Sequence, residues 1–530
     1  MLESSPDWTR RRFLMLTGMA GLSLAACAAR APAHGDQALP AAGLALENAA
    51  RERPVALVNR LTWGATLGDL NALRHLGVAR YVHTQLHPAP DPILPPEVAA
   101  QLQAMTINRT PVADLVRNSF ERLRSIRMSD LPADQKQLQL KAAQQDIGIL
   151  AREAAEQQLL YALYSPNQLQ EQLTWFWMNH FSVFQFKDML RPMMGDYYAR
   201  VIKPHALGRF RDLLRATVLS PQMLSYLDNA NNARGHINEN YAREIMELHT
   251  MGVGAGYTQQ DVTNLARVLT GLGMSFTDHP VHVPPALRTD LWQRDLVVFN
   301  PMRHDPESKL VLGHTFDGHG LDEINGVIDL LAAHPATARH VSTRLAQYFV
   351  AEQPSPALID HMSTAWVRSD GDIATVLQAM FTTPQFAQSL GSLFKDPTHY
   401  VVSSVRLAYE DRTIRNAQPM VNWLQRLGEP LYGRQTPDGY PLDASAWNSS
   451  GQMTTRFELA RIIGSGSAGL FKTDTPDAQP AAAFPQLSNA FFYNALQPTL
   501  SPATRQALAQ ANSPQDWNAL LLSSPEFMRR

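Results

Sequence analysis

Residues 134–158, which read DQKQLQLKAAQQDIGILAREAAEQQ, decide the fold class. Apolar residues recur in this stretch with helical spacing, and charged and amide side chains occupy the other positions. The same kind of pattern extends over residues 114–170. Long amphipathic helices are therefore predicted here.

The helical spacing continues through most of the chain from Pro54 onward, and strand-like alternation is scarce. Residues 281–320 are the exception, because they carry prolines and short extended runs such as Leu296-Val297-Val298-Phe299 and Leu310-Val311-Leu312-Gly313. We therefore expect a mainly α protein: a large multi-helix body with a small extended or β insertion near 281–320.

Ser-Pro or Thr-Pro pairs follow several apolar runs, at residues 165–166, 220–221, 383–384 and 524–525. Ser or Thr can cap a new helix, and proline suits its first position, where no N–H is needed. The recurrence fits either repeated helical hairpins or one helical domain with regular caps.

The N-terminus has the pattern of an export signal. Arg10 and Arg11 stand before Phe13-Leu14, an arrangement similar to the twin-arginine signal, although an ordinary secretory signal is the alternative. Residues 14–26 are apolar, but 13 residues fall short of the roughly 20 that cross a bilayer. We expect a cleaved signal over residues 1–26.

Cys27 is the only cysteine, and Leu24-Ala25-Ala26-Cys27 resembles a lipobox, whose cysteine receives the lipid. The protein would then be a periplasm-facing membrane lipoprotein, with a flexible tether over 27–53 and a helical body over 54–530. Cleavage after Ala31-Pro32-Ala33 would instead give a soluble periplasmic or secreted protein. Either way the mature chain has no thiol, so any catalysis must use other side chains.

Composition describes an ordinary globular protein, with 45% hydrophobic and 18% charged residues. The net charge is −2, and no basic stripe is present. Nucleic acid is therefore not an expected partner.

The densest polar group lies on a helix predicted over residues 241–251, with Tyr241, Ile245 and Leu248 on its core face. Glu244 and Glu247 have the i, i+3 offset of metal ligands in helical bundles, although a solvated face paired with the adjacent arginine is the alternative. His249 is either a core histidine or a ligand or base. As an enzyme, the chain would use His249 and Glu247 catalytically.

Gly252-Val253-Gly254-Ala255-Gly256 follows a helix rather than a strand and lacks the lysine of a phosphate loop. We expect a glycine stop and then a new helix capped by Thr258, with Asp261 three residues later.

Two more histidines are candidate ligands. His180 lies in Trp175-Phe176-Trp177-Met178-Asn179-His180-Phe181, where aromatic neighbours favour a neutral imidazole, and His205 follows Pro204. The hypothesis is that His180, His205 and His249 converge, together with Glu244 or Glu247, on a transition metal such as copper, zinc or iron. The alternative for His180 is an aromatic core helix.

The extended insertion holds a third polar group: His304, Asp305, Lys309 and His314. It could line a cleft, or Asp305 could simply cap a local turn.

Longer motifs resemble one family across about Pro54 to Arg530. They include Leu57-Val58-Asn59-Arg60-Leu61-Thr62-Trp63-Gly64, Trp175–Phe181 as quoted above, Glu247-Leu248-His249-Thr250-Met251-Gly252-Val253, His334-Pro335-Ala336-Thr337-Ala338-Arg339 and Pro437-Asp438-Gly439-Tyr440. These are similar to the bacterial family catalogued as domain of unknown function 1800. The resemblance implies a mainly helical envelope protein, often encoded beside a second uncharacterised family, number 1501. It implies no activity.

Two functions are therefore expected as alternatives. One is an exported enzyme, a metal-dependent oxidoreductase with His and carboxylate ligands. The other is a non-catalytic lipoprotein that binds or assembles an envelope partner, such as a member of family 1501. A hydrolase has least support, because Gly-x-Ser-x-Gly and His-Glu-x-x-His motifs are absent from the sequence.

Overall fold

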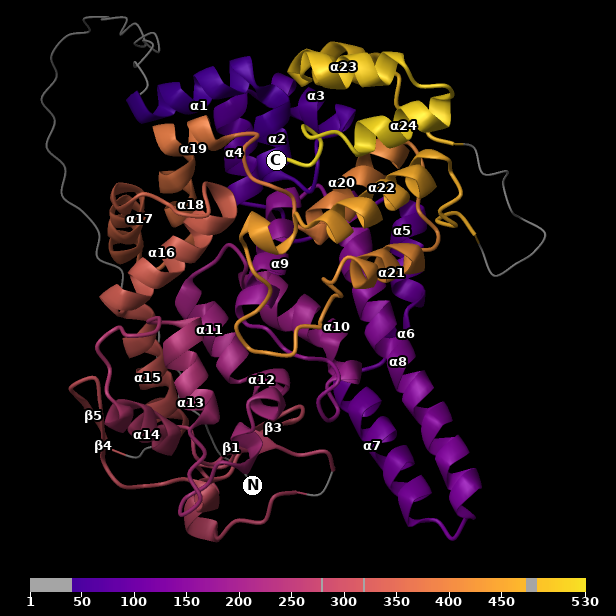
Figure 1. Cartoon of the computed structure of the whole chain (residues 1–530). Coiled ribbons are helices and arrows are strands. Elements are labelled where there is room, and N and C mark those ends of the chain that lie inside the picture. Colours follow the sequence, from indigo (N-terminus) through magenta and orange to yellow (C-terminus); the bar gives the residue numbers. More distant parts are fainter. Residues whose placement is uncertain (1–40, 278–279, 318–319, 473–483) are drawn as a thin grey trace, which may run out of the picture. The chain divides into compact units, whose positions relative to one another are not determined.

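The computed structural model describes residues 41–277, 280–317, 320–472 and 484–530, and these are mainly helical, as expected (Figure 1). The α-helices are α1 (Ala41–Glu52), α2 (Pro54–Leu61), α3 (Leu67–Leu76), α4 (Val78–Leu86), α5 (Pro96–Ala104), α6 (Thr106–Arg109), α7 (Val112–Met128), α8 (Ala133–Tyr164), α9 (Gln168–His180), α10 (Met194–Asp196), α11 (Phe210–Val218), α12 (Pro221–Tyr226), α13 (Asn240–Glu244), α14 (Gln259–Val268), α15 (Leu321–Ala333), α16 (Pro335–Phe349), α17 (Pro356–Ser369), α18 (Ile373–Phe381), α19 (Pro384–Ser389), α20 (Pro397–Tyr409), α21 (Gln418–Arg426), α22 (Ser450–Gly464), α23 (Pro502–Ala509) and α24 (Pro514–Leu522).

Short 3₁₀ and π segments connect many of these helices. The 3₁₀ segments are η1 (Arg191–Met193), η3 (Lys203–His205), η4 (Asn229–Asn231), η6 (Pro285–Leu287), η7 (Pro301–Arg303), η8 (Ala444–Ala446) and η11 (Gln497–Thr499). The π segments are η2 (Tyr197–Ile202), η5 (Ile245–His249) and η10 (Phe492–Leu496).

The described body begins at Ala41, thirteen residues before the predicted start at 54. Part of the predicted tether is therefore helix α1, in which Leu46 and Ala49 are buried. Arg10, Arg11 and Cys27 lie outside the described residues. Within the described part of the chain, no helix combines the length and the apolar character needed to cross a bilayer.

Helices α7 and α8 lie side by side as a hairpin (Figure 1). Helix α8 has 32 residues, about 48 Å at the standard rise, and its first buried residue is Ala143. The far end has a small core of its own, made by Leu123, Ile126, Ala143 and Ile147. We call residues 119–150 the helical arm.

Helix α9 is the most enclosed helix near the candidate site, with every residue except Gln170 buried. Its polar side chains are satisfied inside the protein, as buried polar groups require. Glu171, for example, accepts from the Tyr198 hydroxyl at 2.6 Å and pairs with Lys203 at 2.7 Å.

The expected insertion forms two small antiparallel sheets. One has the order β1 (Leu272–Met274), β3 (Val297–Phe299), β2 (Trp292–Arg294), and the other pairs β4 (Lys309–Val311) with β5 (His314–Phe316). Gly273 is opposite Val298, and Leu310 is opposite Thr315. Leu312 and Gly313 both have positive φ, which a two-residue hairpin turn between β4 and β5 requires.

The predicted helix over 241–251 is interrupted by the π segment η5, which changes its core face. Tyr241 and Ile245 are buried as expected, but Leu248 is not. Met246 and His249 are buried instead. A π turn adds a residue to each turn, so the side chains that follow rotate relative to α-helical spacing.

Several predicted caps are confirmed. Ser220 and Thr383 accept from backbone N–H groups at the starts of α12 and α19, each followed by proline. Thr258 and Asp261 form a capping box at the start of α14, so the glycines before it are a helix stop.

Candidate functional site

The structure gathers three imidazoles at the junction of α9, η5 and α16. The ring centroids of His180 and His249 lie 6.1 Å apart, and those of His180 and His340 lie 6.2 Å apart. His180 also contacts the rings of Phe176 and Trp177, the aromatic surroundings expected for it. We call His180, His249 and His340 the histidine cluster.

Two of these imidazoles bind the end of η5. Nε2 of His180 lies 3.0 Å from the carbonyl oxygen of His249, and Nε2 of His340 lies 3.2 Å from the carbonyl oxygen of Leu248. A carbonyl only accepts, so both Nε2 atoms carry the hydrogen. The last carbonyls of a helix have no partner within it, and the two histidines supply one for each.

His249 is the third member and the most enclosed, with 1% of its surface exposed. Its Nε2 atom is buried and has no hydrogen-bond partner among the described residues. Burial lowers its pKa to about 3, with a smaller contribution from His340. Burial likewise lowers the pKa of His180 and of His340, so the cluster is uncharged at neutral pH.

Close packing holds the chain after η5 against the cluster. Gly252 has φ of 90°, and a Cβ at this position would lie 2.9 Å from Nδ1 of His340. Only glycine fits both the left-handed backbone and this approach.

Charged side chains lie on η5 and α16, which carry His249 and His340, and on α13, which directly precedes η5. Arg344 on α16 is close enough to lower the pKa of His180 and of His340, and its own pKa is lowered by burial. Burial and the neighbouring Glu247 raise the pKa of Glu244. Glu247 pairs with Arg243 at 3.3 Å. This ion pair is the alternative to metal binding that the sequence offered for Glu247.

His205 lies on η3 and is half-buried, with its pKa lowered by burial and opposed by Asp212. No ring contact or hydrogen bond joins it to the histidine cluster among the described residues. In the same residues, no group of three or more His, Cys, Asp or Glu side chains has the arrangement needed to hold a metal ion. His180 and His249 are therefore brought together, but not with His205 and Glu244 as one ligand set.

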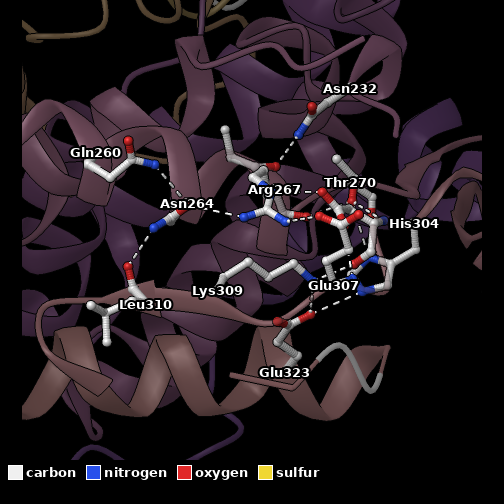
Figure 2. A network of polar contacts seen from close by, with 12 residues as sticks. Asn232, Gln260, Asn264, Arg267, Thr270, His304, Glu307, Lys309, Leu310 and Glu323 are labelled. Atoms are coloured by element: carbon white, nitrogen blue, oxygen red, sulfur yellow. Dashed lines mark hydrogen bonds and ion pairs between the residues drawn. The ribbon is translucent and has the colours of Figure 1, made fainter. Parts of the chain in front are cut away.

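The third polar group is a buried network rather than a cleft (Figure 2). Nζ of Lys309 and Nε2 of His304 each lie 3.0 Å from Oε2 of Glu323, and all three residues are buried. Nδ1 of His304 lies 2.8 Å from the carbonyl oxygen of Thr270. The network joins the insertion to α14 and α15.

The same network extends through Asp305, whose N–H donates to the Thr270 hydroxyl and whose carbonyl accepts from Nζ of Lys309 (Figure 2). Asp305 pairs with Arg267 at 2.7 Å, and the amide of Asn264 donates to the carbonyl of Leu310. His314 on β5 is exposed.

Sequence reasoning missed a second buried polar centre, around Gln172 of α9. Oε1 of Gln172 accepts from Arg530 at 3.2 Å and from the Tyr348 hydroxyl at 3.3 Å. His399 pairs with Asp396 at 2.7 Å, and burial lowers its pKa to about 4. The i, i+3 spacing of Asp396 and His399 in the sequence could have indicated that these two side chains form a pair. His340 was also missed, although it directly follows the quoted motif that ends at Arg339.

The fold and the junction of α9, η5 and α16 define a mainly helical protein in which the imidazoles of His180 and His340 bind the end of a π segment. The chain belongs to the family described as "Protein of unknown function (DUF1800)", whose model matches residues 56–529. A search of curated proteins found no match, and a search of solved structures found none. The expected family is confirmed, and it assigns no activity.

Proposed function

We propose that the chain is an exported envelope lipoprotein that binds a protein partner and catalyses no reaction of its own. The similarity of the N-terminal sequence to an export signal and the position of Cys27 support the proposed compartment, and the helical arm supports the proposed binding. The proposed partner is a member of family 1501, because the two families are often encoded together.

The observation that carries this proposal is the exposed end of the helical arm. Met128 on α7 is 72% exposed, and Leu138 on α8 is 69% exposed. These two helices pack against each other through a small hydrophobic core of their own. Arg124 and Arg127 are exposed near these apolar side chains, and so are Asp130 and Asp134. Exposed apolar side chains among charges of both signs favour a partner surface that has an apolar centre and a charged rim.

The histidine cluster favours the same conclusion. An imidazole that donates from Nε2 to a carbonyl cannot use that nitrogen as a metal ligand. Both His180 and His340 are occupied in this way.

Site-specific photo-cross-linking tests the proposal. A photoreactive residue is placed at Met128 or at Leu138 in the full chain, which is produced together with its neighbouring family-1501 protein. We expect a cross-linked product of the two chains from both positions. The matched control is Val367 on α17, which is 63% exposed and apolar but lies on another part of the fold.

Equal cross-linking from Val367, or none from the arm, would overturn the arm as the binding surface. A second variant, Met128→Glu/Leu138→Glu, keeps the test independent of the photoreactive group. It should weaken partner binding at least tenfold without changing the unfolding transition of the isolated chain.

A metal-dependent oxidoreductase is the second candidate, and one observation favours it. His249 keeps an unpartnered, buried Nε2 beside two other neutral imidazoles. Rotation of His180 or His340 away from its carbonyl would be needed to complete a ligand set with it. Copper, zinc or iron would suit such imidazoles.

A further inference from the structure

A small, partly open cavity lies beside α9, on the side that carries Asn179. Its accessible volume is about 30 Å³, room for one or two water-sized groups. The walls come from α8, α9 and the chain segment 429–440. The side chains that matter for the argument are Trp175, Glu429, Tyr432, Arg434 and Tyr440.

Glu429 is the unexplained group in this cavity. It is 1% exposed, and its Oε2 atom accepts from the backbone N–H of Thr398 at 2.8 Å and from the Thr398 hydroxyl at 2.7 Å. Its Oε1 atom is buried and has no hydrogen-bond partner among the described residues. A buried acid normally has a cation or a full set of donors, so one partner is missing.

Aromatic side chains make up much of the remaining wall. Tyr432 has φ of 59°, a left-handed conformation that costs a non-glycine residue backbone energy. Its hydroxyl donates to Oε1 of Gln158 at 2.8 Å, and its carbonyl accepts from Gln185. Tyr432 therefore adopts a costly backbone conformation at a position that lines the same cavity as Glu429.

The loop on the other side of the cavity is fixed to α9. The amide side chain of Asn179 accepts from the N–H of Tyr440 at 2.6 Å and donates to the Tyr440 carbonyl at 3.0 Å. Arg434 is neutralised by Asp438, to which it donates two hydrogen bonds from Nη2 at 3.0 and 2.9 Å. The only basic group in the wall thus has its own counter-ion.

We propose that this cavity binds an ammonium group, with Oε1 of Glu429 as acceptor and Trp175, Tyr432 and Tyr440 as aromatic walls. An ammonium group is about the size of a water molecule, donates hydrogen bonds and is attracted to aromatic faces. The site is independent of the partner-binding arm. Its ligand is either a free small amine or a lysine side chain presented by another protein.

Ionisation links this binding to pH. Burial and the nearby Asp396 raise the pKa of Glu429 well above its ordinary value, while Thr398 and Arg456 oppose the shift. The phenols of Tyr432 and Tyr440 also have raised pKa values because of burial, so they stay neutral. Entry of a cation ionises Glu429, and one proton leaves for each ammonium bound.

The test is a calorimetric titration of the full chain with methylammonium chloride, with sodium chloride at equal ionic strength as the reference. We expect saturable binding of methylammonium and release of about one proton, measured in buffers of different ionisation enthalpy. At pH values below the pKa of Glu429, the affinity should rise about tenfold for each unit by which the pH is raised. No binding beyond that of sodium, or binding without proton release, would overturn the proposal.

Two variants and a second probe sharpen the titration. Glu429→Gln should lose at least tenfold in affinity, whereas Glu458→Gln, a matched change at an exposed ion pair, should lose none. Equal affinity in both variants would contradict the site. The second probe is lysine amide acetylated at its α-amine, which leaves the side-chain amine free. If this probe binds as tightly as methylammonium, the ligand is a lysine side chain. If it binds more weakly, the ligand is a free small amine.

Discussion

Nε2 of His180 donates to the carbonyl oxygen of His249 at 3.0 Å, and this bond ties the end of α9 to the end of the π segment η5. The contact explains why a histidine occurs within an aromatic helix. A neutral imidazole fills space among Phe176, Trp177 and Phe181 and also satisfies a buried carbonyl.

His180→Ala should destabilise the fold by about 2–4 kcal/mol, because it removes a buried ring and leaves the carbonyl of His249 without its donor. Urea unfolding of the full chain measures the change. His75→Ala, at an exposed position on α3, should stay within about 0.5 kcal/mol of the parent protein. Equal stability of the two variants would show that the contact contributes nothing.

The histidine cluster makes stability depend on pH. Unfolded His249 takes up a proton near pH 6.5, whereas the folded residue does so only near pH 3. The unfolded state therefore binds more protons between these values, so stability is fully present above pH 6.5 and falls as the pH falls. The titration of His249 alone should lower the free energy of unfolding by about 2 kcal/mol when the pH is lowered to 5.

Comparison with His249→Gln isolates this contribution, because the other titrating groups are common to both proteins. Stability of the parent protein should fall more steeply than that of the variant between pH 6.5 and pH 4. Parallel curves over that range would mean that His249 titrates alike in both states.

Lys309→Met should cost about 3–5 kcal/mol, because it leaves the buried Glu323 without its lysine partner. Adding Glu323→Gln to this variant should recover part of the loss, which a double-mutant cycle measures. Arg339→Met breaks an exposed pair with Asp360 and should cost less than about 1 kcal/mol. Additive effects at Lys309 and Glu323 would contradict the pairing.

Gly439→Ala should destabilise the protein by at least about 2 kcal/mol. Gly439 has φ of 74°, and an added Cβ would clash with the backbone carbonyl oxygen of Asn179. Gly451→Ala is the matched control, since Gly451 lies in α22 and an added Cβ meets nothing within 4 Å. It should be neutral or slightly stabilising. Thermal unfolding of both variants gives the comparison.

The helical fold and several caps could be predicted because they depend on local spacing and local chemistry. The capping box at Thr258 and Asp261 lies within four consecutive residues, so the sequence alone contains its pattern. The burial of Met246 in place of Leu248 could not be predicted, because a π turn depends on packing around η5 and not on its residue types.

The candidate site was predictable only in part for a similar reason. His180 and His249 could be singled out from their neighbours in sequence. Their approach, and the addition of His340 from α16, depend on how distant helices pack. Glu429 has no local pattern that marks it as a buried acid with a free oxygen.

Metal content separates a partner-binding lipoprotein from a metal enzyme most directly. The measurement is elemental analysis with an ultraviolet-visible spectrum of the full-length protein, purified without chelators from its native envelope. If the role of His180 and His340 is to donate hydrogen bonds to the carbonyls of η5, the protein should carry far less than one copper, zinc or iron ion per chain. One ion per chain, lost together with its spectrum in His249→Gln, would contradict that role and establish the histidine cluster as a metal centre.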